Sequence, residues 1–317
     1  MRAILVLLLL LLATPAAALR VVVVSDLNGS YGSTEYGKDV YAAVEAIISI
    51  GPDLVISTGD MVAGQRRPHL TEPEIRAMWR GFHAVVSDPL AEAGIPFLVT
   101  PGNHDASAYG GFEREREIFR EEWRTRTPPW PVTGNWPLQY AVDVEGIRFT
   151  SLDVTTVGSF SVGQTEDLKQ LFEGAGETRI VFSHIPLWEF AEGRETEIIG
   201  DADLSLTFGT LGVDLHLSGH HDAFFPGASD GIAYLGQACL GASPRRLIGA
   251  DEPSSRGITL LDIDVETGDI VIDFWASPDF EPGFDMSALP HRLDGFETTL
   301  VRIDLADLPS VHLESRK

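Results

Sequence analysis

Five short polar motifs contain the residue types that bind metal ions or move protons. They are Asp26-x-Asn28, Gly59-Asp60, Gly102-Asn103-His104-Asp105, His184 and Gly219-His220-His221-Asp222. Carboxylate and amide oxygens and imidazole nitrogens all donate lone pairs, so the set combines the hard oxygen ligands and the imidazoles of metal sites. Taken singly, each residue also has an ordinary structural explanation as a cap, a turn residue or a hydrogen-bonded histidine.

Each motif directly follows a short apolar run that is typical of a buried strand. These runs cover residues 19–25, 54–57, 95–100, 180–183 and 213–217. The carboxyl ends of parallel strands lie along one edge of an open α/β sheet. We therefore expect residues that are scattered over nearly 200 positions to converge on one site. Those residues are Asp26, Asp60, Asn103, His184 and His220.

The remaining pattern predicts the elements that must position these motifs. Apolar spacing and turn signals predict helices over residues 39–50, 72–86, 112–124 and 164–172. Residues 127–137 hold four prolines and two tryptophans, which predicts an irregular segment. The middle of the chain predicts a hairpin over residues 140–144 and 147–153, and the tail is rich in predicted strands, over residues 231–235, 258–265, 270–275 and 298–303. With no repeat or long linker, we expect one domain over residues 19–317, built on two sheets.

In this order, the motifs resemble those of the calcineurin-like metallophosphoesterases. That family's pattern runs D-x-H, G-D-x-x-D, G-N-H-D/E, a lone histidine after a strand, and G-H-x-H. The resemblance covers roughly residues 20–225, and its most specific part is Gly102-Asn103-His104-Asp105. It implies a four-layer α/β/β/α sandwich with two mixed sheets. It also implies a metal-dependent hydrolase of phosphate esters.

The resemblance further implies two divalent metal ions. Asp60 would bridge them, Asn103, His184 and His220 would complete one site, and Asp26 would belong to the other. The first of these sites would suit Zn²⁺, Fe²⁺ or Mn²⁺ because it contains two imidazoles. Two ions about 3.5–4 Å apart would hold a bridging hydroxide that attacks the phosphorus.

This sequence departs from the family pattern at the second metal site. Asn28 stands in place of the histidine of D-x-H, and Asp222 in place of the last histidine of G-H-x-H. The site would then consist of Asp26, Asn28, Asp60 and Asp222, all oxygen ligands, which prefer Mn²⁺, Mg²⁺ or Ca²⁺. Ala63 occupies the position where purple acid phosphatases place a tyrosine, which argues against an iron–tyrosinate site.

The same resemblance assigns roles around the substrate. His104 would face the phosphoryl group with Asn103, and would either stabilise that group or protonate the leaving oxygen. Asp105 would orient His104 as a carboxylate partner. His221 is expected to support the ligands from behind or to face the substrate.

Charge limits the choice of substrate and partner. Lys and Arg number 23 and Asp and Glu 47, giving a formal charge of −24 that repels polyanions. We therefore expect a small phosphate-ester substrate, monoester or diester, and no nucleic-acid polymer as partner. The missing histidines leave open a non-catalytic metal- or ligand-binding module on the same fold. A second alternative is hydrolysis of a non-phosphate bond by the same metals. The oligomeric state stays open.

The N-terminus has the features of a secretory signal peptide. A positive start is followed by an apolar run over residues 3–12, by Pro15, and by three alanines that end at Ala18. The competing interpretation, a membrane anchor, needs about 20 apolar residues. Cleavage after Ala18 predicts a periplasmic or secreted protein with no membrane span in the mature chain. The single cysteine, Cys239, excludes an intramolecular disulfide and is expected to be a small buried hydrophobe.

Overall fold

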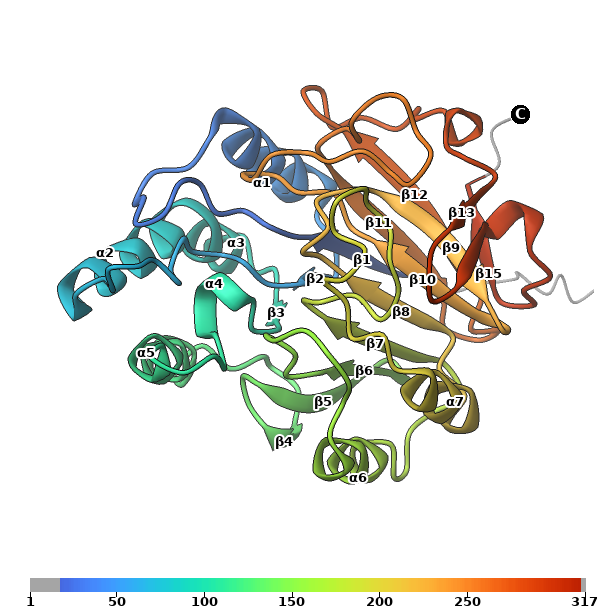
Figure 1. Ribbon diagram of the computed structural model, residues 1–317, viewed down its shortest axis with the longest axis horizontal. Helices are drawn as coiled ribbons and strands as arrows, with labels where there is room; N and C mark the ends of the chain where they lie inside the picture. Colours follow the sequence, from blue (N-terminus) through green and yellow to red (C-terminus); the bar gives the residue numbers. More distant parts are fainter. Residues whose placement is uncertain (1–17, 315–317) are drawn as a thin grey trace, which may run out of the picture.

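The computed structural model describes residues 18–314, in which two β-sheets face each other and helices cover both outer sides (Figure 1). The predicted signal peptide lies outside these residues except for Ala18, the first residue of strand β1. Within residues 18–314, no helix has the length and apolar character needed to cross a membrane.

The first sheet has six strands in the order β15-β12-β11-β1-β2-β3. β1, β2 and β3 are parallel, whereas β11 is antiparallel to both β1 and β12, so the sheet is mixed. Its strands are β1 (Ala18–Val24), β2 (Leu54–Ser57), β3 (Phe97–Val99), β11 (Gly257–Asp264), β12 (Ile270–Ala276) and β15 (Val311–Leu313).

The second sheet has nine strands in the order β13-β14-β9-β10-β8-β7-β6-β5-β4. β10, β8, β7 and β6 are parallel, and the strands at both ends are antiparallel. Its strands are β4 (Val132–Asn135), β5 (Gln139–Val144), β6 (Ile147–Ser151), β7 (Arg179–Ser183), β8 (Leu215–Ser218), β9 (Phe225–Ser229), β10 (Ile232–Gly236), β13 (Arg292–Asp294) and β14 (Thr299–Arg302).

The helices divide between the two outer faces. The N-terminal group covers the first sheet, and α6 and α7 cover the second from the other side (Figure 1). They are α1 (Lys38–Ile50), α2 (Glu72–Phe82), a π-helical turn (His83–Ser87), α3 (Asp88–Glu92), α4 (Asn103–Ala106), α5 (Glu113–Trp123), α6 (Val162–Leu171) and α7 (Ala202–Leu211), with 3₁₀ turns at Met286–Ala288 and Ile303–Leu305.

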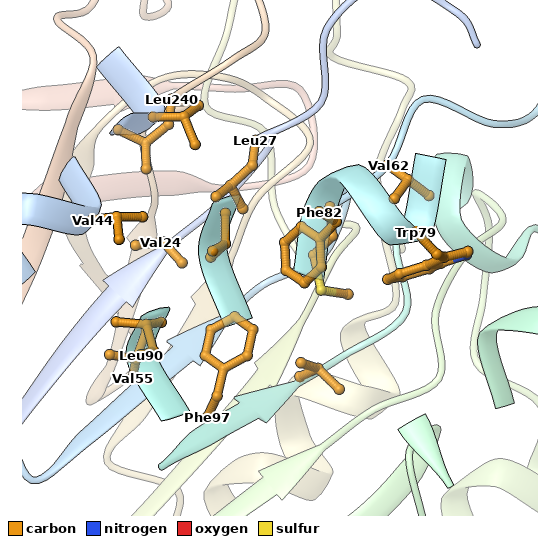
Figure 2. Packing of buried hydrophobic residues seen from close by; sticks show 14 of the residues in the cluster. Val24, Leu27, Val44, Val55, Val62, Trp79, Phe82, Leu90, Phe97 and Leu240 are labelled. Atoms are coloured by element: carbon orange, nitrogen blue, oxygen red, sulfur yellow. The ribbon is translucent and has the colours of Figure 1, made fainter. Parts of the chain in front are cut away.

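Three apolar layers hold these elements together. Alternate side chains of β1 point to opposite faces, so Val22 and Val24 pack against the helices while Val21 and Val23 pack between the sheets. This explains why the predicted strand is apolar at every position. Figure 2 shows the helix-side layer, in which Trp79 and Phe82 of α2 are fully buried.

Most elements predicted from the sequence are present, and the four-layer sandwich with two mixed sheets is confirmed. The expectation of an irregular segment over residues 127–137 is partly wrong, because β4 adds an edge strand there. Helix α7 and strands β9, β13 and β15 were not predicted. Cys239 is buried as expected, and burial raises the pKa of its thiol.

Candidate metal centre and catalytic cleft

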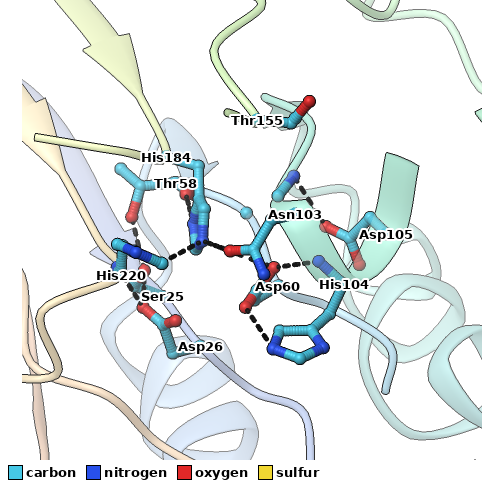
Figure 3. Close-up of polar contacts among 12 residues, drawn as sticks. Ser25, Asp26, Thr58, Asp60, Asn103, His104, Asp105, Thr155, His184 and His220 are labelled. Carbon is cyan, nitrogen blue, oxygen red and sulfur yellow. Dashed lines mark hydrogen bonds and ion pairs between the residues drawn. The ribbon is translucent and has the colours of Figure 1, made fainter. Parts of the chain in front are cut away.

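The strand-end motifs lie together where the two sheets meet. Asp26 follows β1, Asp60 follows β2, Asn103 follows β3, His184 follows β7 and His220 follows β8. Figure 3 shows Asp26 and His220 on one side of Asp60, and Asn103 and His104 on the other. The structure therefore brings these five side chains together, as expected.

The backbone turns sharply at these strand ends. Asp26, Asp60, His220 and Asp222 all have positive φ, between 48° and 64°, and they account for half of the eight such non-glycine residues in the described chain. This conformation costs roughly 1–2 kcal/mol for an L-residue. Such strain concentrates at functional sites, where the surrounding structure must hold it.

Glycines allow the turns to approach one another closely. A Cβ on Gly102 would lie 2.1 Å from Asp60 Oδ1, and one on Gly219 would lie 2.1 Å from Ser25 Oγ and 2.7 Å from Asp26 Oδ2. The glycines of these motifs are thus needed because any side chain would displace a carboxylate of the site.

Four side-chain atoms that can donate lone pairs meet at the centre of the cluster. His184 Nδ1 donates to the carbonyl oxygen of Thr58 at 2.9 Å, which leaves Nε2 with a free lone pair in the neutral ring. That nitrogen faces Asn103 Oδ1 at 2.8 Å and Asp60 Oδ1 at 3.4 Å (Figure 3). The Asn103 amide nitrogen donates to Gln65, so its oxygen is the atom turned inward.

The fourth donor comes from His220. Its Nδ1 lies 3.2 Å from His184 Nε2, while its Nε2 lies 3.1 Å from Glu197 Oε2. This contact with the Glu197 carboxylate favours the tautomer that has its proton on Nε2 and the lone pair of Nδ1 turned inward. The His220 and Arg194 side chains hold the pKa of Glu197 down at about 2.

The oxygen-rich side of the cluster is built around Asp26. Its Oδ2 accepts from Ser25 Oγ at 2.5 Å and from the His220 backbone N–H at 3.0 Å. Ligand atoms of Asp26, Asp60 and His184 all lie within 4.8 Å of one another. Asp222 also lines the cleft, with Oδ2 3.6 Å from Arg245 Nε and Oδ1 buried without a hydrogen-bond partner.

The buried carboxylates leave this cluster short of positive charge. Burial raises the pKa of Asp26 and of Asp222, and neighbouring carboxylates add to both shifts. Burial also acts on Asp60, but the His184 and His104 rings and a backbone N–H hold its pKa below its usual value. Converging lone pairs and crowded carboxylates both fit a divalent cation, and the residues present therefore suit a metal centre.

His104 faces the cleft with one ring nitrogen. Its Nδ1 donates to the Gly64 carbonyl oxygen at 3.0 Å, and its Nε2 lies 3.8 Å from Asp60 Oδ2. Its backbone N–H donates to Asp60 Oδ1 at 2.9 Å. The ring is thus oriented by a backbone carbonyl, with Nε2 as the atom that can exchange a proton inside the cleft.

Asp105 does not orient the His104 ring as the resemblance implied. Its two oxygens accept from the backbone N–H groups of Val62, at 2.9 Å, and Gly102, at 3.0 Å. Its side chain is buried, and that burial together with the Asp60 carboxylate raises its pKa to about 8. The carboxylate ties together the two loops that carry Asp60 and Asn103, which is a positioning role.

His221 does not face the cleft. Its Nδ1 accepts from the Phe190 backbone N–H, and its Nε2 donates to the Glu197 carbonyl oxygen, both at 3.1 Å. The ring is fully buried, and both nitrogens are occupied. Of the two roles expected for His221, the structure therefore favours support of the ligands, because the ring fixes the segment that carries Glu197.

A cleft of about 800 Å³ opens over this cluster. Asn28 lines it and is tied to the neighbouring motif by its backbone N–H, which donates to the Asp60 carbonyl oxygen at 3.1 Å. Several lining side chains were not found from the sequence: Tyr31, Gln65, Tyr109, Arg194, Glu197 and Arg245. No motif marks them, because each reaches the cleft from a loop whose path depends on the fold.

Comparison with known proteins places the chain in a family. The profile of the calcineurin-like phosphoesterases matches residues 19–222, and no curated protein matches the sequence. Among solved structures, a purple acid phosphatase from yellow lupin seeds is 18% identical with a TM-score of 0.64, over 84% of this chain and 53% of that one. GAP50, the anchor in the inner membrane complex of Plasmodium, is 14% identical with a TM-score of 0.52, over 93% and 91%.

At these identities the two structural likenesses show the fold alone, and the chain spans about half the length of the lupin enzyme. The family profile, in contrast, covers more than half of this sequence and includes all five strand-end motifs. The chain therefore belongs to the calcineurin-like phosphoesterase family.

Proposed function

We propose that this phosphoesterase is exported and hydrolyses a small phosphomonoester or phosphodiester. One observation carries the proposal: lone pairs of His184, His220 and Asn103 converge with the Asp60 carboxylate directly beside the free nitrogen of His104. Metal ligands and a proton-exchanging group thus share one cleft.

The described residues suit two neighbouring ions. Asp60, Asn103, His184 and His220 would hold one, and Asp26, Asn28 and Asp222 would add the oxygens of the second with Asp60. Such ions polarise phosphoryl oxygens and lower the pKa of water. Candidate ions are Zn²⁺, Fe²⁺ or Mn²⁺ at the imidazole site, and Mn²⁺, Mg²⁺ or Ca²⁺ at the oxygen site.

His104 would handle the proton of the reaction. Nδ1 is held by the Gly64 carbonyl oxygen, so Nε2 is the position from which a proton can pass to the leaving oxygen. Its side chain is 21% exposed, open to a substrate but held on the inner side by Asp60.

Small size and export are supported by the sequence. A formal charge of −24 repels polynucleotides, and a cleft of about 800 Å³ is the size of a small-molecule site. The predicted signal peptide before residue 19 supports a periplasmic or secreted location. Export is tested by expressing the full chain and determining the N-terminus of the exported protein, which should begin at Leu19.

The substrate class is tested with p-nitrophenyl phosphate and bis(p-nitrophenyl) phosphate on Mn²⁺-loaded protein. We expect turnover of at least one of them and a fall of about 10²–10⁴-fold in kcat for His104→Gln. His69→Gln is the control, because His69 is exposed and lies outside the cleft. Equal turnover by His104→Gln and the unaltered protein would contradict the proposed role of His104.

The alternative of a non-catalytic binding module has one observation in its favour. Arg245 lies 3.6 Å from Asp222 on the oxygen-rich side, where a guanidinium can supply positive charge in place of an ion. A structural neighbour of similar length, GAP50, is named as an anchor. Folded, metal-binding protein that hydrolyses neither ester would favour this alternative.

A further inference from the structure

Exposed apolar side chains gather at the mouth of the cleft. Nine large hydrophobic residues are exposed in the described chain, and three of these line this one cleft: Tyr31, Tyr109 and Val157. Their exposed fractions are 58%, 45% and 43%. Exposed apolar surface that lines a concave site marks a place where a ligand packs.

These side chains are held in place. Backbone hydrogen bonds fix the loop on both sides of Tyr31, from Asn28 N–H to the Asp60 oxygen at 3.1 Å and from Gly32 N–H to the Ala63 oxygen at 2.7 Å. The Tyr109 hydroxyl accepts a hydrogen bond from the Val157 N–H at 3.4 Å, which links Tyr109 to the segment that carries Val157. The loops that carry the apolar wall are thus anchored before any ligand arrives, which lowers the entropic cost of ordering them on binding.

The wall adjoins the leaving-group side of the site. The rings of Tyr31 and His104 are in contact, with centroids 5.1 Å apart. In the proposed hydrolysis the ester oxygen takes the electron pair of the breaking P–O bond and a proton from His104. Water supplies the new oxygen on phosphorus, and the proton it loses passes to solvent, from which His104 is protonated again. The group attached to that ester oxygen lies beside His104, where the Tyr31 ring is an adjacent surface.

The charged side chains lie on the other side of the cleft. Arg194 pairs with Glu197, which contacts His220, and Arg245 lies beside Asp222. Both arginines of the cleft are therefore on the His220 side, away from His104 (Figure 3 shows these two histidines on either side of Asp60). The side that receives the leaving group offers aromatic surface, and the arginines nearest to it, Arg66 beside Gly32 and Arg67 bonded to the Gly110 carbonyl oxygen, lie outside the cleft lining.

We propose that Tyr31 and Tyr109, with Val157, form a subsite for a planar aromatic leaving group, so that the substrate is a phosphate ester of an aromatic or aryl-bearing alcohol. This inference rests on the proposed function, because it places the phosphate at the metal centre. Aromatic rings in contact gain free energy beyond that of simple burial.

The test measures, by calorimetric titration, how tightly phenylphosphonate and methylphosphonate bind to Mn²⁺-loaded protein. Both carry the same phosphonate, neither is an ester, and only one has a ring. Binding is measured because phenol leaves phosphorus more readily than methanol, which would distort a comparison of rates. We expect phenylphosphonate to bind about fivefold to tenfold more tightly.

Variants show whether this preference comes from the subsite. Tyr31→Ala and Tyr109→Ala should each bring the ratio of the two dissociation constants to about twofold or less, and Tyr31→Phe should keep it. Tyr41→Ala is the control, since Tyr41 is 48% exposed on α1 and does not line the cleft.

Equal binding of the two phosphonates, or a ratio that both alanine variants leave unchanged, would overturn the aromatic subsite and leave the proposed function intact. Binding of neither phosphonate would overturn the subsite together with the proposed function.

Discussion

At the scale of single residues, the metal centre depends on how each donor is turned. The Thr58 carbonyl fixes His184, Gln65 fixes the Asn103 amide, and Glu197 fixes His220. Each contact occupies the outer atom of a side chain and leaves the inner atom with a free lone pair. Loss of an outer contact of this kind typically lowers metal affinity by about 10–100-fold.

Glu197→Gln should therefore weaken metal binding about tenfold or more without unfolding the protein. The neutral amide no longer favours a proton on His220 Nε2, and it no longer balances the Arg194 charge. Affinity for Zn²⁺ is measured by competition with a chelating dye. Glu192→Gln is the matched control, because Glu192 lies on the same loop and pairs with Arg246 outside the cleft. Unchanged affinity in Glu197→Gln would refute this role.

Asp105→Asn should lower the free energy of unfolding more than it changes the rate of hydrolysis. The amide can accept from only one of the two N–H groups of Val62 and Gly102, and its own NH₂ opposes the other. Leaving a buried donor unpaired costs about 1–3 kcal/mol. Urea unfolding should show this loss. Full stability combined with a shifted pH–rate profile would instead restore Asp105 as the direct partner of His104.

The sequence was sufficient to predict which residue types meet, but not every role. Asp26, Asp60, Asn103, His184 and His220 could be placed because each follows a strand. Glu197 could not, since its contact with His220 depends on the course of an irregular loop. The ring nitrogens of His104 and His221 form hydrogen bonds with backbone carbonyl oxygens and a backbone N–H. Such backbone partners cannot be recognised from the sequence.

At the scale of elements, the junctions between strands and loops are packed too closely for side chains. Gly219→Ala would place a methyl group 2.1 Å from Ser25 Oγ and 2.7 Å from Asp26 Oδ2. We expect a loss of about 1–3 kcal/mol in the free energy of unfolding, together with weaker metal binding.

Gly163→Ala is the control for this substitution. Gly163 lies in α6 with no neighbour within 4 Å of an added Cβ, and alanine there should stabilise the protein by up to about 1 kcal/mol. Equal melting temperatures for the two variants would contradict the account of the glycine turns.

Elements whose apolar residues follow a regular strand or helix pattern could be predicted. Elements that contain residues unfavourable to their own secondary structure could not. The run of valines in β1 and the apolar spacing of α1 gave correct boundaries to within about a residue or two. Helix α7 contains Gly209 and two threonines, which weaken its helical pattern, although Asp201 caps its first turn. Strand β9 contains Pro226 and Gly227, residues that usually interrupt strands.

At the scale of the whole molecule, acid should destabilise the fold through a buried histidine away from the metal centre. Burial lowers the pKa of His216 from 6.5 to about 3, so the folded protein holds the neutral ring. The stabilising contribution is complete above pH 6.5 and is lost as the pH falls towards 3. At pH 5 the loss is about 2 kcal/mol.

His216→Gln removes the titration while its amide can still donate to Ser183, the hydrogen-bond partner of the ring. Urea midpoints of both proteins are measured at pH 7.5 and pH 5. We expect the variant to be less sensitive to this change than the unaltered protein. Identical sensitivity would show that His216 does not contribute to acid lability.

Metal-dependent turnover shows whether the converging lone pairs form the metal centre of a phosphoesterase. Protein stripped with a chelator is titrated with Mn²⁺, Zn²⁺, Mg²⁺ or Ca²⁺ while hydrolysis of the two p-nitrophenyl esters is followed. We predict no turnover without metal, recovery with at least one ion, and loss of both metal binding and turnover in Asp60→Asn. Turnover that survives in stripped protein or in Asp60→Asn would contradict the account.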